Sequence, residues 1–333
     1  METCCVVGAT GYVGSHVTRE LLKKGYRVRA TCRDPARAEW LKALVPGAEV
    51  ELHALKLTPE GFPADNPLER IVSGCKGVFL CAGYEKQELS TIDFMVNAAT
   101  AVLSAACKNA DATCVVLTSS TGSTNPPGAA ADALKNEAEF WSDPEDQKSR
   151  GKFSPAAKTL MEINAFKFVG RNQKNEVVDR SAAEKAKNVR LCIMNPSWIL
   201  GPQLQPGGIS GNGLPWFAKI VKGEAMSEQI PNDSMSIIHV ADLALLHIAC
   251  VETEGASGRY FGVNRSWPWQ EILKAIQRLH PAYKMPPKNY EAPNPVTRFN
   301  TARRDTLGVP LKDLDEIIGD TLSYLKHKDC LTG

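Results

Sequence analysis

The sequence predicts an α/β fold in which a doubly wound parallel sheet carries a smaller mixed α/β lobe near the C-terminus. Three observations lead to this prediction. Residues 4–7 form a short apolar run, spaced glycines and an amphipathic helix follow it, and residues 26–32 form a second strand. Strand and helix patterns then alternate to about residue 195. A mixed pattern follows. Such alternation is typical of a parallel sheet whose strands are joined by helices.

The turn after the first strand has the glycine spacing of a phosphate-binding loop. Its glycines lie between the strand and the helix at 15–24. Without a Cβ atom the backbone can turn sharply and approach a pyrophosphate, whose charge is favoured by the N–H groups of the helix's first turn. Such glycines also close ordinary surface turns, but the flanking strand and helix favour dinucleotide binding in a Rossmann-type fold. The predicted binding residues are Gly8, Thr10, Gly11, Tyr12, Val13 and Gly14.

The end of the second strand favours NADP over NAD. An NAD site usually offers a carboxylate here to the ribose 2′-hydroxyl, whereas an arginine suits a 2′-phosphate. Thr31 and Cys32 occupy the positions where the acid would stand, and Arg33 follows them. Arg37 is a second candidate for the phosphate. A purely solvent-facing role is the alternative for both arginines.

The middle of the chain supplies further strands of the sheet. Ligands bind at the carboxyl ends of parallel strands, so Ala82 and Tyr84, at the end of one predicted strand, are placed near the cofactor. A surface position is the alternative for Tyr84. Residues 125–152 have the composition of an exposed loop, with a short helix around 131–141. The strands predicted in this part are 50–57, 77–82, 114–118 and 189–194, and the helices are 92–108 and one that begins near 155.

We predict two interleaved lobes, with NADP binding in residues 1–195 and substrate binding in the smaller lobe 196–333. The loop 203–215 is rich in glycine and proline, as suits a substrate-facing loop, and Trp216 and Phe217 after it are candidate apolar walls. The second lobe is predicted to contain strands at 236–240 and 260–263 and helices at 242–250, 269–279 and 314–328.

The composition argues against several partners. The 333 residues carry a formal charge of +2, which gives no reason to expect nucleic acid or an acidic membrane. No apolar stretch reaches the roughly twenty residues of a membrane span and no signal-peptide pattern precedes the first strand, so a cytoplasmic protein is expected. The ten cysteines include no C-x-x-C pair and the six histidines show no metal-ligand spacing. Reduced thiols and no metal are therefore predicted.

With these elements in place, the sequence resembles the extended short-chain dehydrogenase/reductase family. Within it, the similarity is to the branch of dihydroflavonol reductases, cinnamoyl-CoA reductases and yeast-type aldehyde reductases. The likeness covers about residues 3–325 in the family's order. The motifs that carry it are GATGYVGSHV at 8–17, RATCRDP at 29–35, LTSS at 117–120, WSD at 141–143, AKTL at 157–160, NPS at 195–197, LGP at 200–202 and IHVAD at 238–242.

The resemblance implies a nicotinamide cofactor, a small-molecule carbonyl substrate and a Ser, Tyr, Lys catalytic set. In that set a phenol exchanges a proton as hydride moves, an ammonium lowers the pKa of the phenol and holds the ribose, and a serine hydroxyl steadies the oxyanion. Ser120 matches the serine, with Thr121 beside it. Lys158 matches the lysine, as both a catalytic and a cofactor-binding residue, and Pro196 is a further implied cofactor contact.

The tyrosine of that set is missing. Ser154 stands four residues before Lys158, where the family's spacing places the tyrosine on the same face of a helix. No tyrosine lies between residues 85 and 259, so no realignment restores it. A serine hydroxyl is too weak an acid to replace a phenol, and Ser154 could at best relay a proton. Two further departures from the family are Lys56, where relatives usually have an aspartate, and a longer polar tract at 168–182.

Three interpretations follow. In the leading one the chain is an NADP-dependent oxidoreductase that reduces an aldehyde, ketone or dihydroflavonol-like carbonyl, with the proton coming from Tyr84, a water or the substrate. In the second it is a catalytically impaired NADP(H)-binding protein that acts as a sensor, a scaffold or a subunit of a larger assembly. The third, an isomerase or sugar epimerase, needs the same tyrosine. A hydrolase has less support because no Gly-x-Ser-x-Gly elbow is present. A monomer or homodimer is expected.

Overall fold

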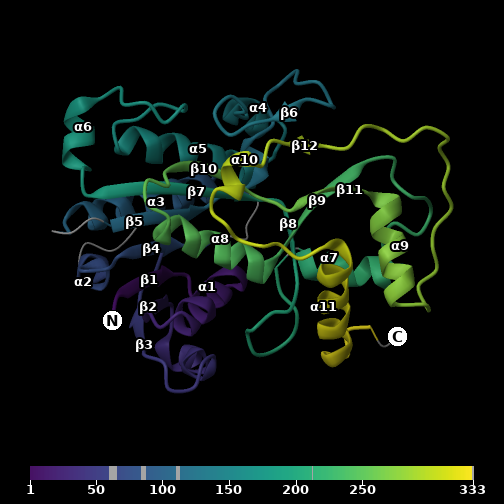
Figure 1. The fold of residues 1–333 in the computed structure, drawn as a ribbon, viewed down its shortest axis with the longest axis horizontal. Helices are drawn as coiled ribbons and strands as arrows, with labels where there is room; N and C mark the ends of the chain where they lie inside the picture. Colours follow the sequence, from purple (N-terminus) through teal and green to yellow (C-terminus); the bar gives the residue numbers. More distant parts are fainter. Residues whose placement is uncertain (60–65, 84–87, 110–112, 212, 332–333) are drawn as a thin grey trace.

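A seven-stranded parallel sheet forms the centre of the computed structural model, which describes residues 1–333 except 60–65, 84–87, 110–112, 212 and 332–333. The strand order is β10-β7-β5-β4-β1-β2-β3, and every neighbouring pair is parallel (Figure 1). The predicted doubly wound sheet is therefore confirmed. Its strands are β1 Thr3–Val7, β2 Arg27–Cys32, β3 Val50–Ala54, β4 Gly77–Leu80, β5 Thr113–Thr118, β7 Val189–Pro196 and β10 Gly258–Gly262.

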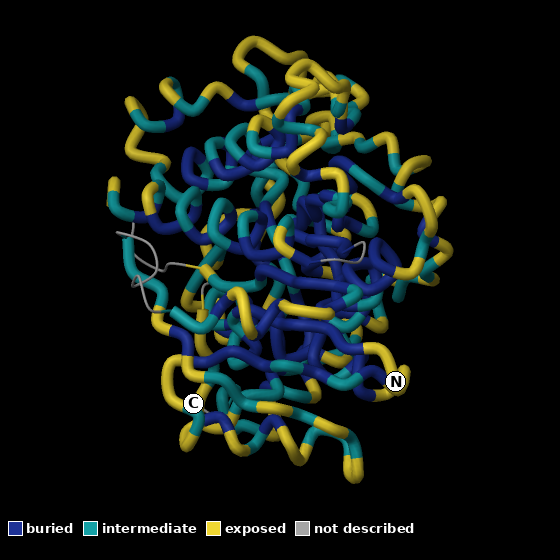
Figure 2. The backbone as a smooth tube through the Cα atoms, turned by 90° about the vertical axis from the view of Figure 1, so that its left-hand side faces the viewer, coloured by how far each residue is buried: buried dark blue, intermediate teal, exposed yellow. Residues whose placement is uncertain are grey.

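Helices cover both faces of this sheet, and the most deeply buried backbone lies in the layers between them (Figure 2). On one face α1 and α8 lie side by side with the 3₁₀ segment η1, and on the other α3 and α5 lie side by side with α2 beyond them. Each layer presents apolar side chains to the strands. The residues of β1, β4 and β10 are all buried, whereas those of the edge strand β3 are only partly buried or exposed. The bounds are α1 Tyr12–Lys23, η1 Pro35–Ala43, α2 Leu68–Val72, α3 Ser90–Cys107, α5 Phe153–Phe168 and α8 Val240–Glu252.

Helix α3 is the one helix among the described residues that is long and apolar enough to cross a membrane by length and composition alone. Half of its 18-residue window is buried inside the protein. Its buried side chains pack on the sheet and on α5, in the same apolar cluster as Val115 and Phe166. The apolar character of α3 is thus accounted for by a core position.

A smaller lobe is built on a three-stranded sheet of order β11-β9-β8, in which β8 and β9 are parallel and β9 and β11 antiparallel. Three helices gather around it, apart from the large sheet (Figure 1). Trp198, Trp216 and Trp269 meet in its core, with ring centroids 4.8 to 5.6 Å apart. The bounds are β8 Trp198–Leu200, β9 Ser234–His239, β11 Arg265–Pro268, α7 Gly213–Val221, α9 Trp269–Leu279 and α11 Leu314–His327.

The chain crosses between the two lobes more than once. Helix α8 and strand β10 both belong to the large sheet's layers, although they follow the smaller sheet's first strands in sequence. A separate two-stranded pair joins β6 Leu134–Lys135 to β12 Arg298–Phe299 and so ties residues after β5 to the C-terminal part. The division at residue 195 stays a prediction.

The helix expected around 131–141 is wrong. Residues 131–141 contain turns and the short strand β6, because Asn136 and its neighbours bond locally: the Asn136 side chain accepts from Ala138 N and Glu139 N. Asparagine side chains compete in this way with helical hydrogen bonds. The remaining short helices of the described chain are α4 Pro144–Ser149, α6 Arg180–Lys185 and α10 Ala302–Asp305, with the 3₁₀ turn η2 Thr121–Ser123.

Candidate cofactor and catalytic site

The glycine turn after β1 leaves no room for side chains. Gly8 has a φ of +86°, and a Cβ atom there would lie 2.7 Å from Ala82 N. A Cβ atom on Gly14 would lie 2.2 Å from Gly8 O. Gly11 is the N-cap of α1 and provides no side-chain cap for the N–H groups of the first turn. A bare turn beside an uncapped helix N-terminus fits the pyrophosphate of a dinucleotide.

The other residues predicted in this motif join the turn to the smaller lobe. Thr10 is half-buried in the turn, and Tyr12 and Val13 open α1. The Tyr12 hydroxyl donates to Gly201 O at 2.8 Å. One turn further along α1, His16 Nε2 lies 2.8 Å from Pro202 O. These two contacts hold the first turns of α1 against the two residues that follow strand β8.

Arg33 and Arg37 lie where the 2′-phosphate of NADP is expected. Both are exposed, Arg33 directly after β2 and Arg37 in η1, and neither makes a hydrogen bond or ion pair recorded among the described residues. Asp34 next to them is engaged, since its carboxylate caps η1 by accepting from Ala36 N. Lys56, where the resemblance implies an aspartate, is exposed as well.

The candidate catalytic side chains come together at the carboxyl end of β5. Lys158 Nζ donates to Thr118 O at 2.7 Å, and Ser154 lies one turn earlier on α5. Ser120 is the N-cap of η2, and its hydroxyl accepts from Gly122 N at 3.0 Å. The η2 turn packs on the first turn of α5. Ser120, Ser154 and Lys158 therefore lie at one edge of the sheet, the edge at which the glycine turn also lies.

The Lys158 ammonium has an unusual acidity. Burial lowers the pKa of Lys158 to about 8, while the Glu162 carboxylate, one turn further along α5, and the Cys81 thiol oppose that shift. An ammonium with a pKa this close to neutrality exists in both protonation states under ordinary conditions. Such a group can hold an anion or a ribose, and it can also exchange a proton.

Behind these residues lies a buried network centred on the Glu162 carboxylate, which sequence reasoning did not identify. Glu162 is 0% exposed and Arg259, from β10, is 3% exposed. The network fixes the backbone on both sides of Ser120 and immediately before Pro196. Its hydrogen bonds to Glu162 Oε1 come from Ser119 Oγ, from Ser123 Oγ at 2.6 Å and from Asn195 Nδ2 at 2.7 Å, and Arg259 Nε lies 2.8 Å from Glu162 Oε2.

A buried histidine supports the strand end from the opposite face. His247 Nδ1 lies 2.7 Å from Leu243 O, so this nitrogen carries the proton. His247 Nε2 then accepts from the Thr118 hydroxyl at 2.9 Å. Burial lowers the pKa of His247 to about 4, which keeps the ring neutral. Thr118 is thus held by two contacts: its backbone carbonyl accepts from Lys158, and its hydroxyl donates to His247.

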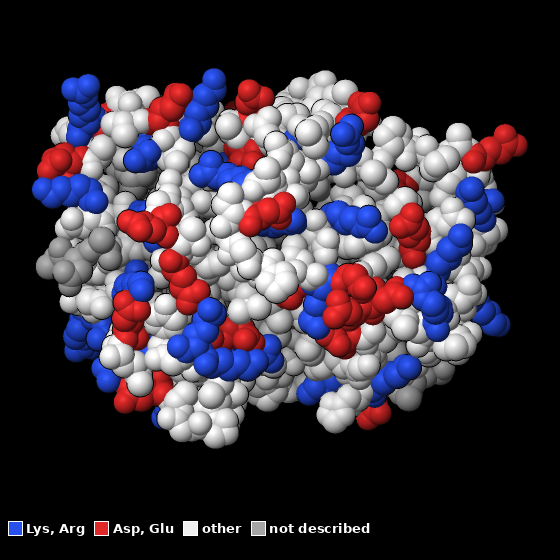
Figure 3. All heavy atoms as spheres, viewed as in Figure 1, with Lys and Arg blue, Asp and Glu red and all other residues white. Residues whose placement is uncertain are grey.

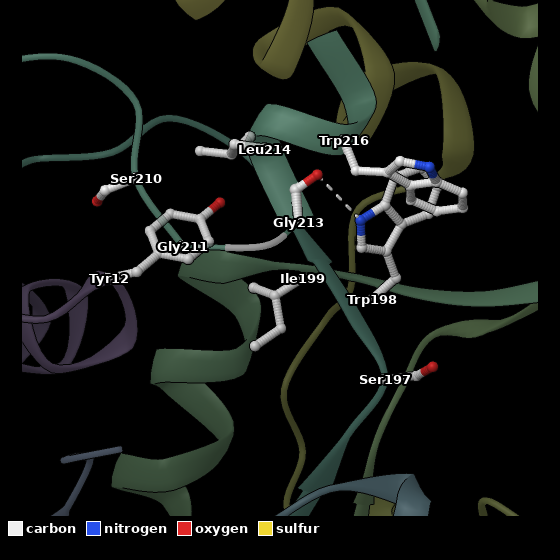
Figure 4. Close-up of a pocket in the computed structure, with 9 residues that line it drawn as sticks. All are labelled: Tyr12, Ser197, Trp198, Ile199, Ser210, Gly211, Gly213, Leu214 and Trp216. Carbon is white, nitrogen blue, oxygen red and sulfur yellow. Dashed lines mark hydrogen bonds between the residues drawn. The ribbon is translucent and has the colours of Figure 1, made fainter. Parts of the chain in front are cut away.

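A cavity of about 490 Å³ opens between the first turn of α1 and the smaller lobe (Figure 4). None of the described residues that line it carries a charged side chain. Tyr12 forms one wall, and Trp198 and Trp216 face it from the other side, with the Trp198 indole N–H donating to Gly213 O at 3.3 Å. Phe217 is fully buried behind this wall, so of the two predicted aromatic walls only Trp216 lines the cavity. The lining residues are Tyr12, Ser197, Trp198, Ile199, Ser210, Gly211, Gly213, Leu214 and Trp216.

The cavity is bordered both by the helix that follows the glycine turn and by the chain after β7. Tyr12 belongs to the helix end that suits a pyrophosphate, and Ser197 follows Pro196, which ends β7 beside β5. The cavity thus lies between the first turn of α1 and the chain after β7, and Ser120 and Lys158 are not among the described residues that line it.

Tyr84, the tyrosine predicted as an alternative proton donor, lies outside the described residues. Among the described tyrosines, Tyr12 bonds to Gly201 O and Tyr26 to Glu252, and Tyr260 accepts from Ser257 N. None of these three hydroxyls is hydrogen-bonded to Lys158 or Ser120.

Two features of the sequence could have identified the Glu162 network. They are the spacing of four residues between Lys158 and Glu162 and the asparagine before Pro196.

Known proteins resemble this chain in the segment of the glycine turn and along its length. Residues 8–149 match a family model described as NAD(P)H-binding. Cinnamoyl-CoA reductase 2 of Arabidopsis thaliana is 30% identical over 97% of this chain and 92% of its own length. Tetraketide alpha-pyrone reductase 2 of the same plant is 29% identical over 99% of this chain and 100% of its own length.

Solved structures show the same fold. Vestitone reductase from alfalfa superposes with a TM-score of 0.77 at 22% identity, covering 99% of this chain and 100% of its own. Gre2 from Candida albicans in complex with NADPH superposes with a TM-score of 0.78 at 21% identity, covering 98% of this chain and 99% of its own. At this identity the likeness concerns the fold alone.

The parallel sheet, the glycine turn and the family match define an α/β protein that binds a nicotinamide dinucleotide. The chain belongs to the extended short-chain dehydrogenase/reductase family. Its curated relatives are reductases. The expected resemblance is confirmed, and so is the expected class of cofactor.

Proposed function

We propose that this chain is an NADPH-dependent reductase of small aldehydes, ketones or dihydroflavonol-like carbonyl compounds. The observation that carries the proposal is the placement of Lys158, whose ammonium is held 2.7 Å from Thr118 O beside Ser120. This pair lies at the same edge of the sheet as the glycine turn. The names of the relatives, reductases of cinnamoyl-CoA, tetraketide alpha-pyrones and dihydroflavonols, support this class of reaction.

Each part of the site has a role in this proposal. The N–H groups at the start of α1 would hold the pyrophosphate, Arg33 and Arg37 the 2′-phosphate, and Lys158 the ribose. The backbone of Ala82 and the Pro196 ring would border the cofactor at the ends of β4 and β7. When bound, NADPH supplies a hydride. Ser120 would orient the carbonyl oxygen and stabilise the negative charge that develops on it.

A second candidate function is NADP(H) binding without turnover, and one observation favours it. Ser154 stands where the family resemblance places the tyrosine, and the pKa of a serine hydroxyl lies far above neutrality. General acid catalysis contributes roughly 10²–10⁴-fold to a rate, so a site without any acid would reduce carbonyls very slowly. Such a chain would serve as a sensor, a scaffold or a subunit of a larger assembly.

NADPH oxidation with a panel of aromatic and aliphatic aldehydes, ketones and dihydroflavonols separates the two candidates. The native chain, Ser154→Tyr and Ser154→Ala would be assayed together, with NADPH affinity measured for each by fluorescence. Turnover by the native chain supports the reductase. Tight NADPH binding with turnover only after Ser154→Tyr would instead show that the fold is retained for binding. Ser154→Ala is the matched control, because it changes the same position without adding a phenol.

A further inference from the structure

The family resemblance expects a phenol four residues before Lys158, where this chain has Ser154. The described residues around Lys158 restrict which group could act in its place. The described groups able to titrate around Lys158 are Glu162 on its own helix, Cys81 after β4, His247 of α8 behind Thr118, and Arg259 of β10 beyond Glu162. Each of these four groups is unsuited as a proton donor to a substrate.

Glu162 and Arg259 are paired and buried in the network. His247 is held neutral, with its one N–H bonded to Leu243 O. Burial raises the pKa of Cys81 to about 11, so its thiol is a weak acid. Among the described groups of the site, the Lys158 ammonium is the one that combines acidity near neutrality with a position at the catalytic edge.

The position of Lys158 allows a second task beside holding a ribose. Its ammonium has three N–H bonds, and one of them is used by Thr118 O. Ser154 precedes it by four residues on α5, so both side chains lie on the same face of that helix. The anchored ammonium and the serine hydroxyl form a short polar path along the first turns of α5.

We propose that the Lys158 ammonium is the proton donor to the substrate's carbonyl oxygen, with the Ser154 hydroxyl as the relay. This inference rests on the proposed function. As the carbonyl carbon receives hydride from the reduced cofactor, its oxygen takes the Ser154 hydroxyl proton, and Ser154 takes a proton from Lys158. One N–H bond of Lys158 breaks and the electron pair stays on nitrogen. Water then returns a proton to the neutral amine.

The central test is the pH dependence of turnover in Lys158→Arg. Arginine keeps the positive charge and the hydrogen-bond donors but does not release its proton in proteins. The native chain should lose kcat as the pH rises past about 8, where Lys158 deprotonates. Lys158→Arg should lower kcat roughly 10²–10⁴-fold at neutral pH and remove that alkaline fall. Its NADPH affinity should stay within a few-fold of the native value.

A second readout does not depend on activity. In protein labelled at lysine Cε with carbon-13, the signal absent from Lys158→Arg identifies Lys158, and its titration should have a midpoint near pH 8. Lys167→Arg, an exposed change on the same helix, is the matched control and should retain the native rate and pH profile. Lys158→Gln serves as the second variant should Lys158→Arg not fold.

The outcomes are distinct. An active native enzyme whose alkaline fall survives in Lys158→Arg, or disappears in Tyr84→Phe instead, would overturn the role of Lys158 and leave the reductase intact. A Lys158 midpoint above pH 10 would also overturn it. Absence of turnover by the native chain with every carbonyl tested would overturn the proposed function together with this inference.

Discussion

Arg259 and Glu162 form a buried ion pair, with Nε and Oε2 separated by 2.8 Å, directly behind the catalytic edge. The two residues are far apart in the sequence: Glu162 belongs to helix α5 and Arg259 to the edge strand β10. The guanidinium also donates to Glu137 O and Phe140 O, and it stacks 3.8 Å from the centre of the Trp141 ring. One arginine thus holds helix α5 and the segment that follows η2.

Removing the charge of Glu162 should destabilise the protein strongly. In Glu162→Gln the buried Arg259 guanidinium would lose its paired carboxylate and keep the weaker attraction of Glu137. Breaking a buried pair by removing one partner costs about 3–5 kcal/mol. Urea unfolding measures the loss. Glu184→Gln, which removes the exposed pair with Lys187, is the control and should change stability by less than about 1 kcal/mol. Equal losses in both variants would contradict the role given to the network.

Adding a side chain to the glycine turn should weaken cofactor binding. In Gly14→Ala the new Cβ atom would lie 2.2 Å from Gly8 O, so the turn must open. We expect NADPH to bind at least tenfold more weakly, a loss of about 1.4 kcal/mol. Isothermal titration checks this against Gly319→Ala in α11, where the nearest atom lies 3.9 Å from the added Cβ. Native affinity in Gly14→Ala would exclude the turn as the pyrophosphate site.

Arg33→Ala should weaken NADPH binding far more than NADH binding. A hydrogen bond to a charged group contributes about 1.5–3 kcal/mol, which corresponds to roughly 10–100-fold in affinity for the cofactor that carries the 2′-phosphate. Dissociation constants for both cofactors give the answer, with the exposed Arg180→Ala as control. Equal losses for NADPH and NADH would remove Arg33 from the phosphate site.

Stability should fall in acid because the chain buries neutral histidines. The pKa of His247 is lowered by burial to about 4, below the 6.5 of an unfolded histidine, so its contribution is complete above pH 6.5 and is lost as the pH falls toward 4. For this fully buried ring the loss amounts to roughly 3 kcal/mol.

His247→Gln should therefore show a smaller decrease in unfolding free energy between pH 7 and pH 4.5 than the native chain. His16 and His239 are also buried and have lowered pKa values, so part of the decrease should remain. Urea unfolding at a series of pH values tests this, with the exposed His327→Gln as control. An unchanged pH dependence in His247→Gln would show that its protonation is not linked to unfolding.

The fold and the cofactor end of the site could be predicted because their signals are local. The glycine turn is specified by residues 8–14, and each strand is a short apolar run beside a helix. The polar network could not be predicted in this way. Glu162 and Arg259 are 97 positions apart in the sequence, and the order of the strands in the sheet brings them together. A buried glutamate in an amphipathic helix is indistinguishable, in sequence, from one on its solvent face.

The failed helix at 131–141 has a related cause. Its composition includes alanine and glutamate, which favour helix, but the backbone there is held by long-range partners: Arg259 takes two of its carbonyls and β12 pairs with β6. The charge balance can be read from the sequence without tertiary information. The sequence has 39 basic and 37 acidic residues, and basic and acidic side chains are intermingled over the face of the molecule shown in Figure 3.

Strand β10 has a consequence for how the protein is made. The strand adds to the edge of the sheet beside β7 and delivers Arg259 to Glu162, yet it is synthesised long after β1 and the glycine turn. During translation the nucleotide-binding half can therefore assemble early, whereas the catalytic edge must wait for residue 262 to leave the ribosome. Until then the Glu162 carboxylate is without its arginine, and the free edge of β7 is without the strand that pairs with it.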